Sequence, residues 1–303
     1  MVQSPLNYTG GKYRLLPQLL PLFPDRVGLL LDLFCGGGNV GANIKCDKIW
    51  FNDINRDVIK LLELFAKSDP EKLLSEIEKI IRKFGLSDVS KYGYEFYGCN
   101  SSEGVSRYNE PHYNELRKYT NSFKRKTRSY YVHLYVLIVF AFNNQIRFNS
   151  SHAFNLPVGK RDFNLRMRDK LLKFSEIVSS ADPIFTYIDF RKIDVSRLKE
   201  DDFVYVDPPY LITCATYNEQ NGWTEKDERD LLMFLDSLNQ RNIRFALSNV
   251  LTNKGKANTI LREWLERNPQ YNCTHLNYDY SNSNYHKTES EQKSDEVLIR
   301  NYI

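Results

Sequence analysis

The stretch LLLDLFCGGGNVG at residues 29–41 decides the fold class. Its first half is a short continuous apolar run, which is typical of a strand covered on both faces of a parallel sheet. The glycines that follow let the backbone turn tightly, and we expect them to open a helix whose first amides favour polar or anionic groups. A second strand, KIWFND at residues 48–53, comes next. This order of strand, glycine loop, helix and strand predicts the first part of an α/β sheet.

The same alternation returns in the second half of the chain. Apolar runs at residues 184–188, 203–206 and 243–250 predict strands, and helical periodicity at residues 224–240 and 257–268 predicts helices. A strand-rich tail through DEVLIRNYI ends the chain. We therefore expect a single α/β sheet that is built from both ends of the sequence.

An insertion separates the two halves of this sheet. Residues 66–159 are expected to form a mainly helical domain that carries a β-hairpin, with QIRF at 145–148 and AFNL at 153–156 as its strands. The sheet domain is then discontinuous and consists of residues 1–65 and 160–303.

Composition excludes several classes of protein. With 303 residues, 42% apolar and 26% charged, the chain is long enough for a core and too apolar for bulk disorder. The longest apolar run, residues 130–142, is shorter than the roughly 20 residues that cross a bilayer, so we interpret it as a buried helix. The first 14 residues contain no apolar signal segment. Five cysteines without CxxC spacing argue against a disulfide framework or a zinc ribbon. We expect a cytoplasmic protein with reduced thiols.

Charge is distributed unevenly along the chain. The net charge is +4, but residues 91–173 contain 15 Lys and Arg against 6 Asp and Glu. Many of the 20 tyrosines lie among these cations. Cations interleaved with aromatic rings suit phosphate contact and base stacking, so a polyanionic partner is indicated. A solvated, lysine-rich surface is the alternative on charge alone.

The glycine loop indicates a nucleoside-containing cofactor. Asp53 ends the second strand, where a carboxylate can accept hydrogen bonds from a ribose diol. Because Gly36, Gly38 and Gly41 also satisfy GxGxxG, a nicotinamide-dependent dehydrogenase stays open at this point. A tight turn that binds nothing is the other alternative.

DPPY at residues 207–210 follows the apolar strand FVYV and points to the chemistry. Pro208 and Pro209 end the strand and donate no backbone hydrogen bond. The Asp207 side chain and the Pro208 carbonyl can accept the two hydrogens of an exocyclic amino group, while Tyr210 can stack on the attached base. A plain strand-to-turn junction is the alternative for these four residues.

The ordered motifs resemble a known family. YTGGKYRLLP at residues 8–17, DLFCGGG, DPPY, SNV at 248–250 and the NYH…DEV region at 284–297 are similar to segments of Dam-type, alpha-group DNA adenine methyltransferases. The resemblance implies a Rossmann-like class I methyltransferase sheet with an inserted target-recognition domain. It also implies transfer of a methyl group from S-adenosylmethionine to adenine N6 in double-stranded DNA.

The family's roles carry over onto matching positions of this sequence. The resemblance assigns catalysis to Asp207, Pro208, Pro209 and Tyr210. It assigns cofactor binding to Tyr8, Lys12, Asp32, Phe34, Gly36, Asp53, Phe190, Arg191 and Asp207, although Phe190 could equally be a core residue. It assigns DNA binding to Asn143, Gln145, Arg147, Asn149, Pro157 and Arg161. Within that set, Arg147 is our candidate for a bidentate contact with guanine. Arg125 and Lys126 are added as phosphate contacts, with plain solvation as their alternative.

The implied mechanism requires neither a metal ion nor a covalent enzyme intermediate. Two acceptors on the amino hydrogens turn the N6 lone pair out of conjugation, and the adenine must flip out of the duplex to reach them. Cys35, in the cofactor loop, is expected to serve packing.

The resemblance favours GATC as the recognition sequence. Gln145 departs from it, because better-known Dam enzymes have an apolar side chain there, and this departure leaves the outer base pair open. Cytosine-N4 or RNA methylation on the same fold and a catalytically inactive DNA-binding regulator are the remaining alternatives. A cognate restriction endonuclease in the same system is left open, without a stable complex and without a membrane partner. The expected location is the bacterial nucleoid or a phage-infected cell.

Overall fold

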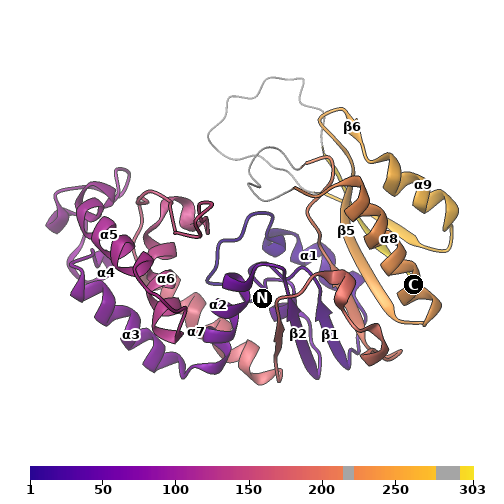
Figure 1. The fold of residues 1–303 in the computed structure, drawn as a ribbon, viewed down its shortest axis with the longest axis horizontal. Coiled ribbons are helices and arrows are strands. Elements are labelled where there is room, and N and C mark those ends of the chain that lie inside the picture. The colour runs from indigo at the N-terminus through magenta and orange to yellow at the C-terminus, as the bar shows by residue number, and fades with distance from the viewer. Residues whose placement is uncertain (214–221, 278–293) are drawn as a thin grey trace. The chain divides into compact units, whose positions relative to one another are not determined.

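The strand predicted at residues 29–34 is present as β1 (Leu29–Asp32), and its last three residues are buried. The computed structural model describes residues 1–213, 222–277 and 294–303 (Figure 1). The chain divides into two compact units. What we call the helical unit consists of Met1–Gly11, Gly36–Ala42 and Asn55–Pro183, and what we call the sheet unit consists of Lys12–Cys35, Asn43–Ile54 and Ile184–Ile303. The target-recognition domain expected at residues 66–159 is a functional assignment and stays a prediction.

In the sheet unit, β1 lies between two parallel neighbours. It pairs with β2 (Lys48–Asn52) on one side and with β4 (Phe203–Val206) on the other. Its neighbours lie on opposite sides although both follow it in sequence, so β1 marks the point where the winding of the sheet reverses. In open α/β sheets, ligands bind outside the carboxyl ends of the strands at such a point.

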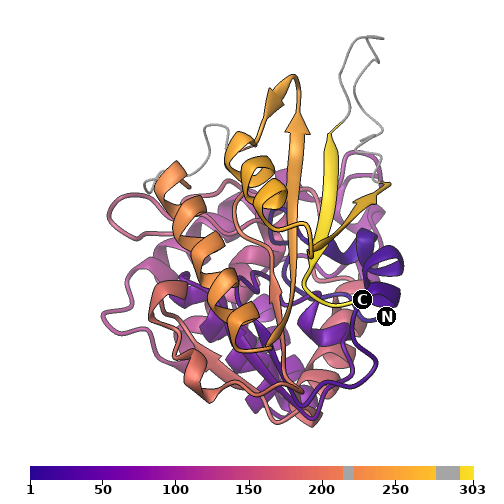
Figure 2. The ribbon, with the colours of Figure 1, turned by 90° about the vertical axis from the view of Figure 1, so that its right-hand side faces the viewer.

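The other strands extend the sheet in both directions. The order is β3-β2-β1-β4-β5-β8-β7, with β6 paired to β5. The remaining bounds are β3 (Ile184–Thr186), β5 (Arg244–Asn253), β6 (Lys256–Ala257), β7 (Asn272–Leu276) and β8 (Asp295–Arg300). β8 inserts antiparallel between β5 and β7, and Figure 2 shows it in yellow beside the long orange β5. This sheet confirms the Rossmann-like α/β fold.

Helices of the sheet unit bury leucines against these strands. α8 (Glu225–Gln240) begins with a capping box between Thr224 and Asp227, which satisfies its first backbone amides. Leu235 of α8 and Leu261 of α9 (Thr259–Arg267) belong to the buried core of the sheet. The shorter elements are η1 (Lys12–Leu15), α1 (Leu16–Leu19), η2 (Leu20–Leu22), η6 (Phe190–Lys192) and η7 (Val195–Arg197).

The helical unit is built around the apolar run that the sequence placed inside the protein. This run forms α6 (Arg128–Phe140), which is buried from Tyr130 to Phe140 and packs against α2, α3 and α5. The other elements are η3 (Gly41–Asn43), α2 (Arg56–Lys67), α3 (Pro70–Lys83), α4 (Val89–Tyr92), η4 (Glu95–Tyr97), α5 (Ser106–Asn121), η5 (Phe142–Asn144) and α7 (Leu165–Ser180). Among the described residues, no helix has the length and apolar character needed to span a membrane.

The prediction of a helix after the glycine loop was wrong. Only the single turn η3 follows the loop before β2 begins at Lys48. The glycine loop takes up most of this connection, with Gly36 and Gly38 at positive φ, and the residues left over are too few for a regular helix. An anion site based on a helix N-terminus is therefore absent from this described segment.

The expected hairpin follows an antiparallel course but contains no strand. Phe148 and Phe154 form an isolated bridge, and the Asn149 amide donates to the Ala153 carbonyl at 2.9 Å. The Asn149 side chain also accepts from the amides of Ser151 and Ala153, so it competes with a strand for backbone hydrogen bonds. Pro157, which donates none, follows directly and ends the pairing.

The core of the helical unit yields a stability prediction. Phe65 of α2 is fully buried and contacts Tyr135 and Phe174, at centroid distances of 5.0 and 6.4 Å. Phe65→Ala should lower the free energy of unfolding by about 3–5 kcal/mol, because it leaves a cavity among rigid rings. Urea unfolding followed by circular dichroism measures the change. As a control, Phe96→Ala, at a side chain that is 66% exposed, should stay within about 0.5 kcal/mol of the unsubstituted protein.

Candidate active site

DPPY lies at the carboxyl end of β4, beside the end of β1. Asp32, the last residue of β1, is in register with Tyr205 of β4, and Asp207 follows two residues later. Asp207 is 17% exposed, and Pro208 beside it is buried. The reacting groups predicted from sequence therefore lie where the winding of the sheet reverses.

The Asp207 carboxylate is held through one of its two oxygens. Its Oδ1 lies 3.1 Å from the Lys12 ammonium and accepts a hydrogen bond from the Tyr210 hydroxyl at 3.0 Å. No hydrogen bond to its Oδ2 occurs within the described parts of the chain. These contacts fix the rotation of the carboxylate, while Oδ2 can still accept a hydrogen bond.

A second carboxylate completes this cluster. Glu296 of β8 is 1% exposed, and its Oε1 lies 3.2 Å from the Lys12 ammonium and 3.2 Å from the Tyr210 hydroxyl. The Lys12 ammonium also lies 4.8 Å from the centre of the Tyr210 ring, within cation–π range. We call Lys12, Asp207, Tyr210 and Glu296 the carboxylate cluster.

Burial and charge set the protonation of the carboxylate cluster. Burial alone would lower the pKa of Lys12, but the Asp207 and Glu296 carboxylates raise that pKa above its ordinary value. Burial raises the pKa of Asp207, and the charge of Glu296 adds to this effect while Lys12 opposes it. Burial, together with both carboxylates, raises the pKa of Tyr210 well above its usual range. At neutral pH the cluster therefore contains an ammonium and a neutral phenol.

Acidic side chains end β1 and follow β2. Asp32 is 1% exposed and Asp53 is 7% exposed. Burial, with the charges of both, raises the pKa of the Cys35 thiol well above its ordinary value. A thiol in this state is a poor nucleophile, which fits the packing role expected for Cys35.

Asn52, a residue that the sequence analysis did not select, ties the ends of these strands together. Its amide group donates to the carbonyls of Leu33 and Ile188, each at 3.1 Å, and accepts from the Thr186 hydroxyl at 2.7 Å. The loops that begin at Leu33 and Ile188 are therefore fixed to each other by one buried side chain.

Three aromatic rings gather near these loops. Phe34 and Phe190, both predicted from sequence, lie 5.6 Å apart, and Trp223 lies 5.7 and 5.9 Å from them. The Trp223 indole donates to the buried Glu228 carboxylate at 2.6 Å. Trp223 was missed because an isolated tryptophan ahead of a helix has no recognisable spacing.

Arg191 is bound by acids of its own unit. Its guanidinium lies 4.5 Å from the Phe190 ring and pairs with Asp189 at 3.0 Å, with Asp230 at 2.7 Å and with Asp227. These pairs hold the guanidinium against Phe190, so an indirect effect on a ligand through that ring suits Arg191 better than a direct ion pair.

In the helical unit, Tyr8 packs against the start of the glycine loop. A Cβ added to Gly36 would lie 2.7 Å from Cδ1 of the Tyr8 ring, and the Gly36 φ of +48° is itself unfavourable for other residues. Gly36 is therefore required for the approach of Tyr8, and any larger side chain would displace this ring.

The predicted DNA-binding residues, all in the helical unit, differ in what they already contact. Arg147 donates through Nε to Asn155 at 2.9 Å, and Arg161 donates to the Tyr94 hydroxyl and the Ser101 carbonyl, each at 3.3 Å. Asn143 has a positive φ of 53°, and its carbonyl accepts from Asn7 at 2.7 Å.

The remaining members of that set contribute mainly through the backbone or through turns. The backbone amide of Gln145 donates to the Phe142 carbonyl, and the Pro157 carbonyl accepts from the Phe142 amide at 2.9 Å. The Asn149 side chain caps its own turn.

The two candidate phosphate contacts are not equivalent. Lys126 forms an ion pair with Asp57 at 2.7 Å, whereas the exposed Arg125 side chain has no hydrogen bond or ion pair within the described residues. Arg125 therefore suits a phosphate better than Lys126 does.

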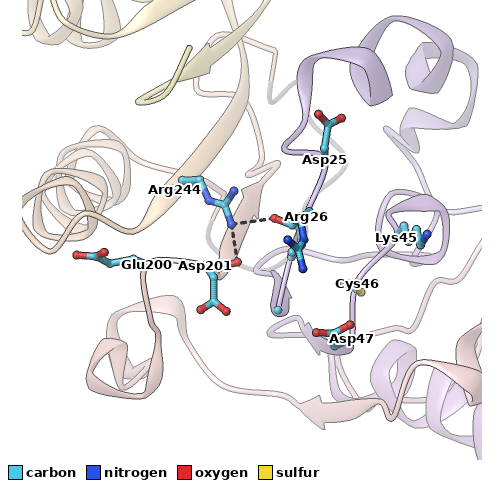
Figure 3. Close-up of a pocket in the computed structure, with 10 residues that line it drawn as sticks. Asp25, Arg26, Lys45, Cys46, Asp47, Glu200, Asp201 and Arg244 are labelled. Carbon is cyan, nitrogen blue, oxygen red and sulfur yellow. Dashed lines mark hydrogen bonds between the residues drawn. The ribbon is translucent and has the colours of Figure 1, made fainter.

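A separate cavity of about 730 Å³ lies at the opposite edge of the same sheet (Figure 3). Residues that precede β1, β2 and β4 line it, together with Arg244 of β5, which donates to the carbonyls of Arg26 and Asp201. It contains none of the residues selected from sequence. In the described portion of the chain, no group of three or more His, Cys, Asp or Glu side chains could hold a metal ion.

Comparison with known proteins identifies relatives along nearly the whole chain. Residues 8–295 match the family described as D12 class N6 adenine-specific DNA methyltransferase. The chain is 39% identical to Type II methyltransferase M.FokI of Planomicrobium okeanokoites and 41% identical to modification methylase StsI of Streptococcus sanguinis. Each alignment covers 99% of this chain but only 43% of the relative. DNA adenine methylase of Escherichia coli K12 is 25% identical, over 86% of this chain and 84% of its own length.

The state of Cys35 yields a second prediction. Because its thiol is 7% exposed and its pKa is raised, iodoacetamide at pH 8 should leave Cys35 unmodified in the folded protein and should alkylate it in urea. Peptide mass spectrometry measures both. The exposed Cys273 serves as the internal control and should react faster in the folded state. Rapid alkylation of folded Cys35 would contradict the burial described above.

Proposed function

Because the chain belongs to the D12 class of N6 adenine-specific DNA methyltransferases, we propose that it transfers a methyl group from S-adenosylmethionine to N6 of an adenine in duplex DNA. Membership confirms the resemblance to adenine methyltransferases that the ordered motifs indicated, and it leaves a nicotinamide-dependent dehydrogenase without support. The chain spans about 43% of the length of M.FokI and StsI.

The observation that carries the proposal is the anchored carboxylate at the end of β4. Asp207 offers Oδ2 beside the backbone of Pro208, while Lys12 and Tyr210 occupy Oδ1. An amino group that donates one hydrogen to Asp207 and the other to the Pro208 carbonyl would turn its lone pair out of conjugation with the purine. Negative charge at this position also stabilises the positive charge that develops on N6 during attack.

Proton balance follows from the same arrangement. A bond forms between N6 and the methyl carbon while the bond from that carbon to the donor sulfur breaks. N6 then carries one hydrogen too many, and the proton passes to the Asp207 carboxylate and from there to solvent. The raised pKa of Asp207 makes it a better proton acceptor than an exposed aspartate.

S-adenosylmethionine, when bound, supplies an electrophilic methyl group on a sulfonium. Phe34 and Trp223 offer aromatic surface for its adenine, while Phe190 is 4% exposed and supports them from the sheet core. Asp53 offers an acceptor for its ribose. Asp32 contributes negative charge suited to a cationic donor. Because two carboxylates already hold the Lys12 ammonium, we propose that Lys12 acts mainly through Asp207.

DNA recognition is assigned to the helical unit. It contains 22 Lys and Arg against 15 Asp and Glu, which favours binding to a polyanion. We propose that Arg147 reads a guanine and that the target adenine leaves the duplex before reaction. GATC is the first recognition sequence to test, with its outer base pair open because of Gln145.

The relatives named as a Type II methyltransferase and a modification methylase support a role in a restriction–modification system. We propose that, in the cytoplasm of a bacterium, adenine methylation by this chain protects DNA sites from cleavage by a cognate endonuclease.

Substitution of the acceptor tests the chemistry. Asp207→Ala should reduce methyl transfer by at least about 1000-fold while DNA affinity changes little, because the carboxylate acts on the reacting nitrogen. The measurement is N6-methyladenine per duplex after incubation with S-adenosylmethionine, read by mass spectrometry of nucleosides. Asp201→Ala, an exposed acid that precedes the same strand, is the matched control and should retain activity. Normal turnover in Asp207→Ala, or methylcytosine as the product, would overturn the proposal.

Separate variants distinguish base reading from phosphate contact. Arg147→Ala should relax sequence discrimination, with a cost of about 1–3 kcal/mol at one base position. Arg125→Ala should instead weaken binding to all sequences equally and lower the slope of log affinity against log salt by about 1. Lys126 suits this comparison less, because its loss also leaves Asp57 without its ion pair. Equal effects of the two variants on all sequences would contradict the assignment of Arg147.

A further inference from the structure

Glu296 belongs to the carboxylate cluster, and its described contacts are with Lys12 and Tyr210, behind the oxygen of Asp207 that is proposed to meet the substrate. Glu296 is near the start of β8, which lies between β5 and β7, and it is in register with Val250 of β5 and Leu276 of β7. At 1% exposure, its carboxylate is as buried as the apolar residues that follow it in β8. A buried carboxylate is costly unless its partners satisfy it.

Its contacts mirror those of Asp207. Oε1 of Glu296 and Oδ1 of Asp207 both face the Lys12 ammonium, at 3.2 and 3.1 Å. Both oxygens also face the Tyr210 hydroxyl, at 3.2 and 3.0 Å. Lys12 and Tyr210 are therefore shared between a carboxylate that reacts and a carboxylate that lies behind them.

This sharing has a geometric consequence for Asp207. Without a second acceptor, the Lys12 ammonium and the Tyr210 hydroxyl could follow either oxygen of Asp207 as it rotates. With Glu296 fixed in β8, both donors stay at one position, and Asp207 satisfies them only through Oδ1. Oδ2 is thereby reserved for the amino group of the target base.

Charge adds a second consequence. One ammonium lies between two carboxylates, so the cluster keeps an excess negative charge when both acids are ionised. Glu296 raises the affinity of Asp207 for a proton and helps to keep Lys12 protonated. A more basic Asp207 accepts the N6 proton more readily.

We propose that Glu296 is a positioning residue for methyl transfer, which anchors Lys12 and Tyr210 so that Asp207 presents one oxygen, in a charged and basic state, to the target amino group. The inference rests on the proposed function and assigns a role to a residue of the DEV segment that the sequence analysis left without one. Glu296 acts through its neighbours and makes no contact with the base or the methyl donor in this scheme.

Within residues 1–213, 222–277 and 294–303, three titratable side chains have contacts or partners in common with Glu296. Lys12, Asp207 and Tyr210 contact or share partners with it, and burial raises the pKa of the nearby Tyr205, with Asp207, Asp32 and Glu296 adding to that shift. On the adjoining strand ends, His275 and Asp295 form an exposed pair of their own at 2.7 Å. Asp207 is therefore the group whose titration should report on Glu296 in the acidic range.

The sign of the expected pH effect follows from these charges. Glu296 raises the pKa of Asp207, so a neutral residue at position 296 should lower it. Methyl transfer requires ionised Asp207, and the acidic limb of the rate profile marks its protonation. In Glu296→Gln this limb should move to lower pH.

Single-turnover kinetics of the full chain with duplex DNA and S-adenosylmethionine test the proposal, because they isolate chemistry from product release. Glu296→Gln should reduce the single-turnover rate by about 10- to 100-fold through misplacement of Asp207, with unchanged affinity for DNA. Its acidic limb should shift as described. Glu296→Asp keeps the charge but shortens the side chain, so it should lower the rate while the limb stays nearer its original position.

Asp295→Asn is the matched control, since it removes a carboxylate from the neighbouring position of β8 on a half-buried side chain that pairs with His275. It should leave both the rate and the acidic limb unchanged. Should Glu296→Gln fail to fold, as judged by urea unfolding, Tyr210→Phe replaces it by removing the hydroxyl that the two carboxylates share. A lowered single-turnover rate in Tyr210→Phe supports the anchoring, and an unchanged rate overturns it.

The outcomes separate this inference from the proposed function. If the unsubstituted chain forms no N6-methyladenine, the proposed function fails. If it forms the product but Glu296→Gln matches its rate and its pH profile, the function stands and the role of Glu296 is wrong. A lower rate with an unmoved acidic limb overturns the electrostatic part of the proposal.

Discussion

The burial of one ammonium between two carboxylates is the interaction on which the active site depends. Lys12, Asp207 and Glu296 come from the start, the middle and the end of the chain, and each would be costly to bury without the others. The Tyr210 hydroxyl lies within hydrogen-bond distance of both acids, at 3.0 and 3.2 Å, and its single hydrogen is shared between them. Folding must therefore bring three distant segments together before any of these charges is satisfied. The cluster connects η1, the end of β4 and β8 in the sheet unit by the same contacts that orient the Asp207 carboxylate.

The topology of the sheet explains why these segments can meet. Reversal of the winding at β1 leaves the carboxyl ends of β1 and β4 side by side, which places Asp207 at an open edge. β8 enters antiparallel between β5 and β7, so a residue near its beginning, Glu296, lies at the same edge where the parallel strands finish. One antiparallel strand thus adds a carboxylate from the chain's last residues to a site whose other members follow parallel strands.

Sequence patterns predicted the parts of this structure that depend on local composition. Continuous apolar runs identified β1, β2 and β4, because strands buried on both faces contain few polar residues. The DPPY motif located Asp207 because two prolines must end a strand. The prediction of a helix after the glycine loop was wrong, because sequence periodicity does not show how many residues the loop itself uses. The expected hairpin forms no strands, because the Asn149 side chain accepts backbone hydrogen bonds in its turn. Glu296 and Trp223 were missed for another reason. The contact of Glu296 with Tyr210 joins residues 86 positions apart, and Trp223 binds the buried Glu228 of the next helix. No spacing in the sequence encodes either contact.

Charge along the sequence also requires the structure for its interpretation. The excess of cations at residues 91–173 is real, but several of them are paired with acids that precede this stretch: Lys126 with Asp57, Arg128 with Glu76, and Arg168 with Glu78 and Asp88. These pairs join α2, α3 and the residues after them to the neighbourhood of α6 and α7, so acids of the same unit already offset part of this positive charge. The surplus that they leave is what can attract DNA, and it belongs to side chains such as Arg125 that have no acidic partner among the described residues. Under the proposed function, a local charge count therefore indicates which unit suits a polyanion, whereas only the contacts identify which of its cations have no acidic partner among the described residues.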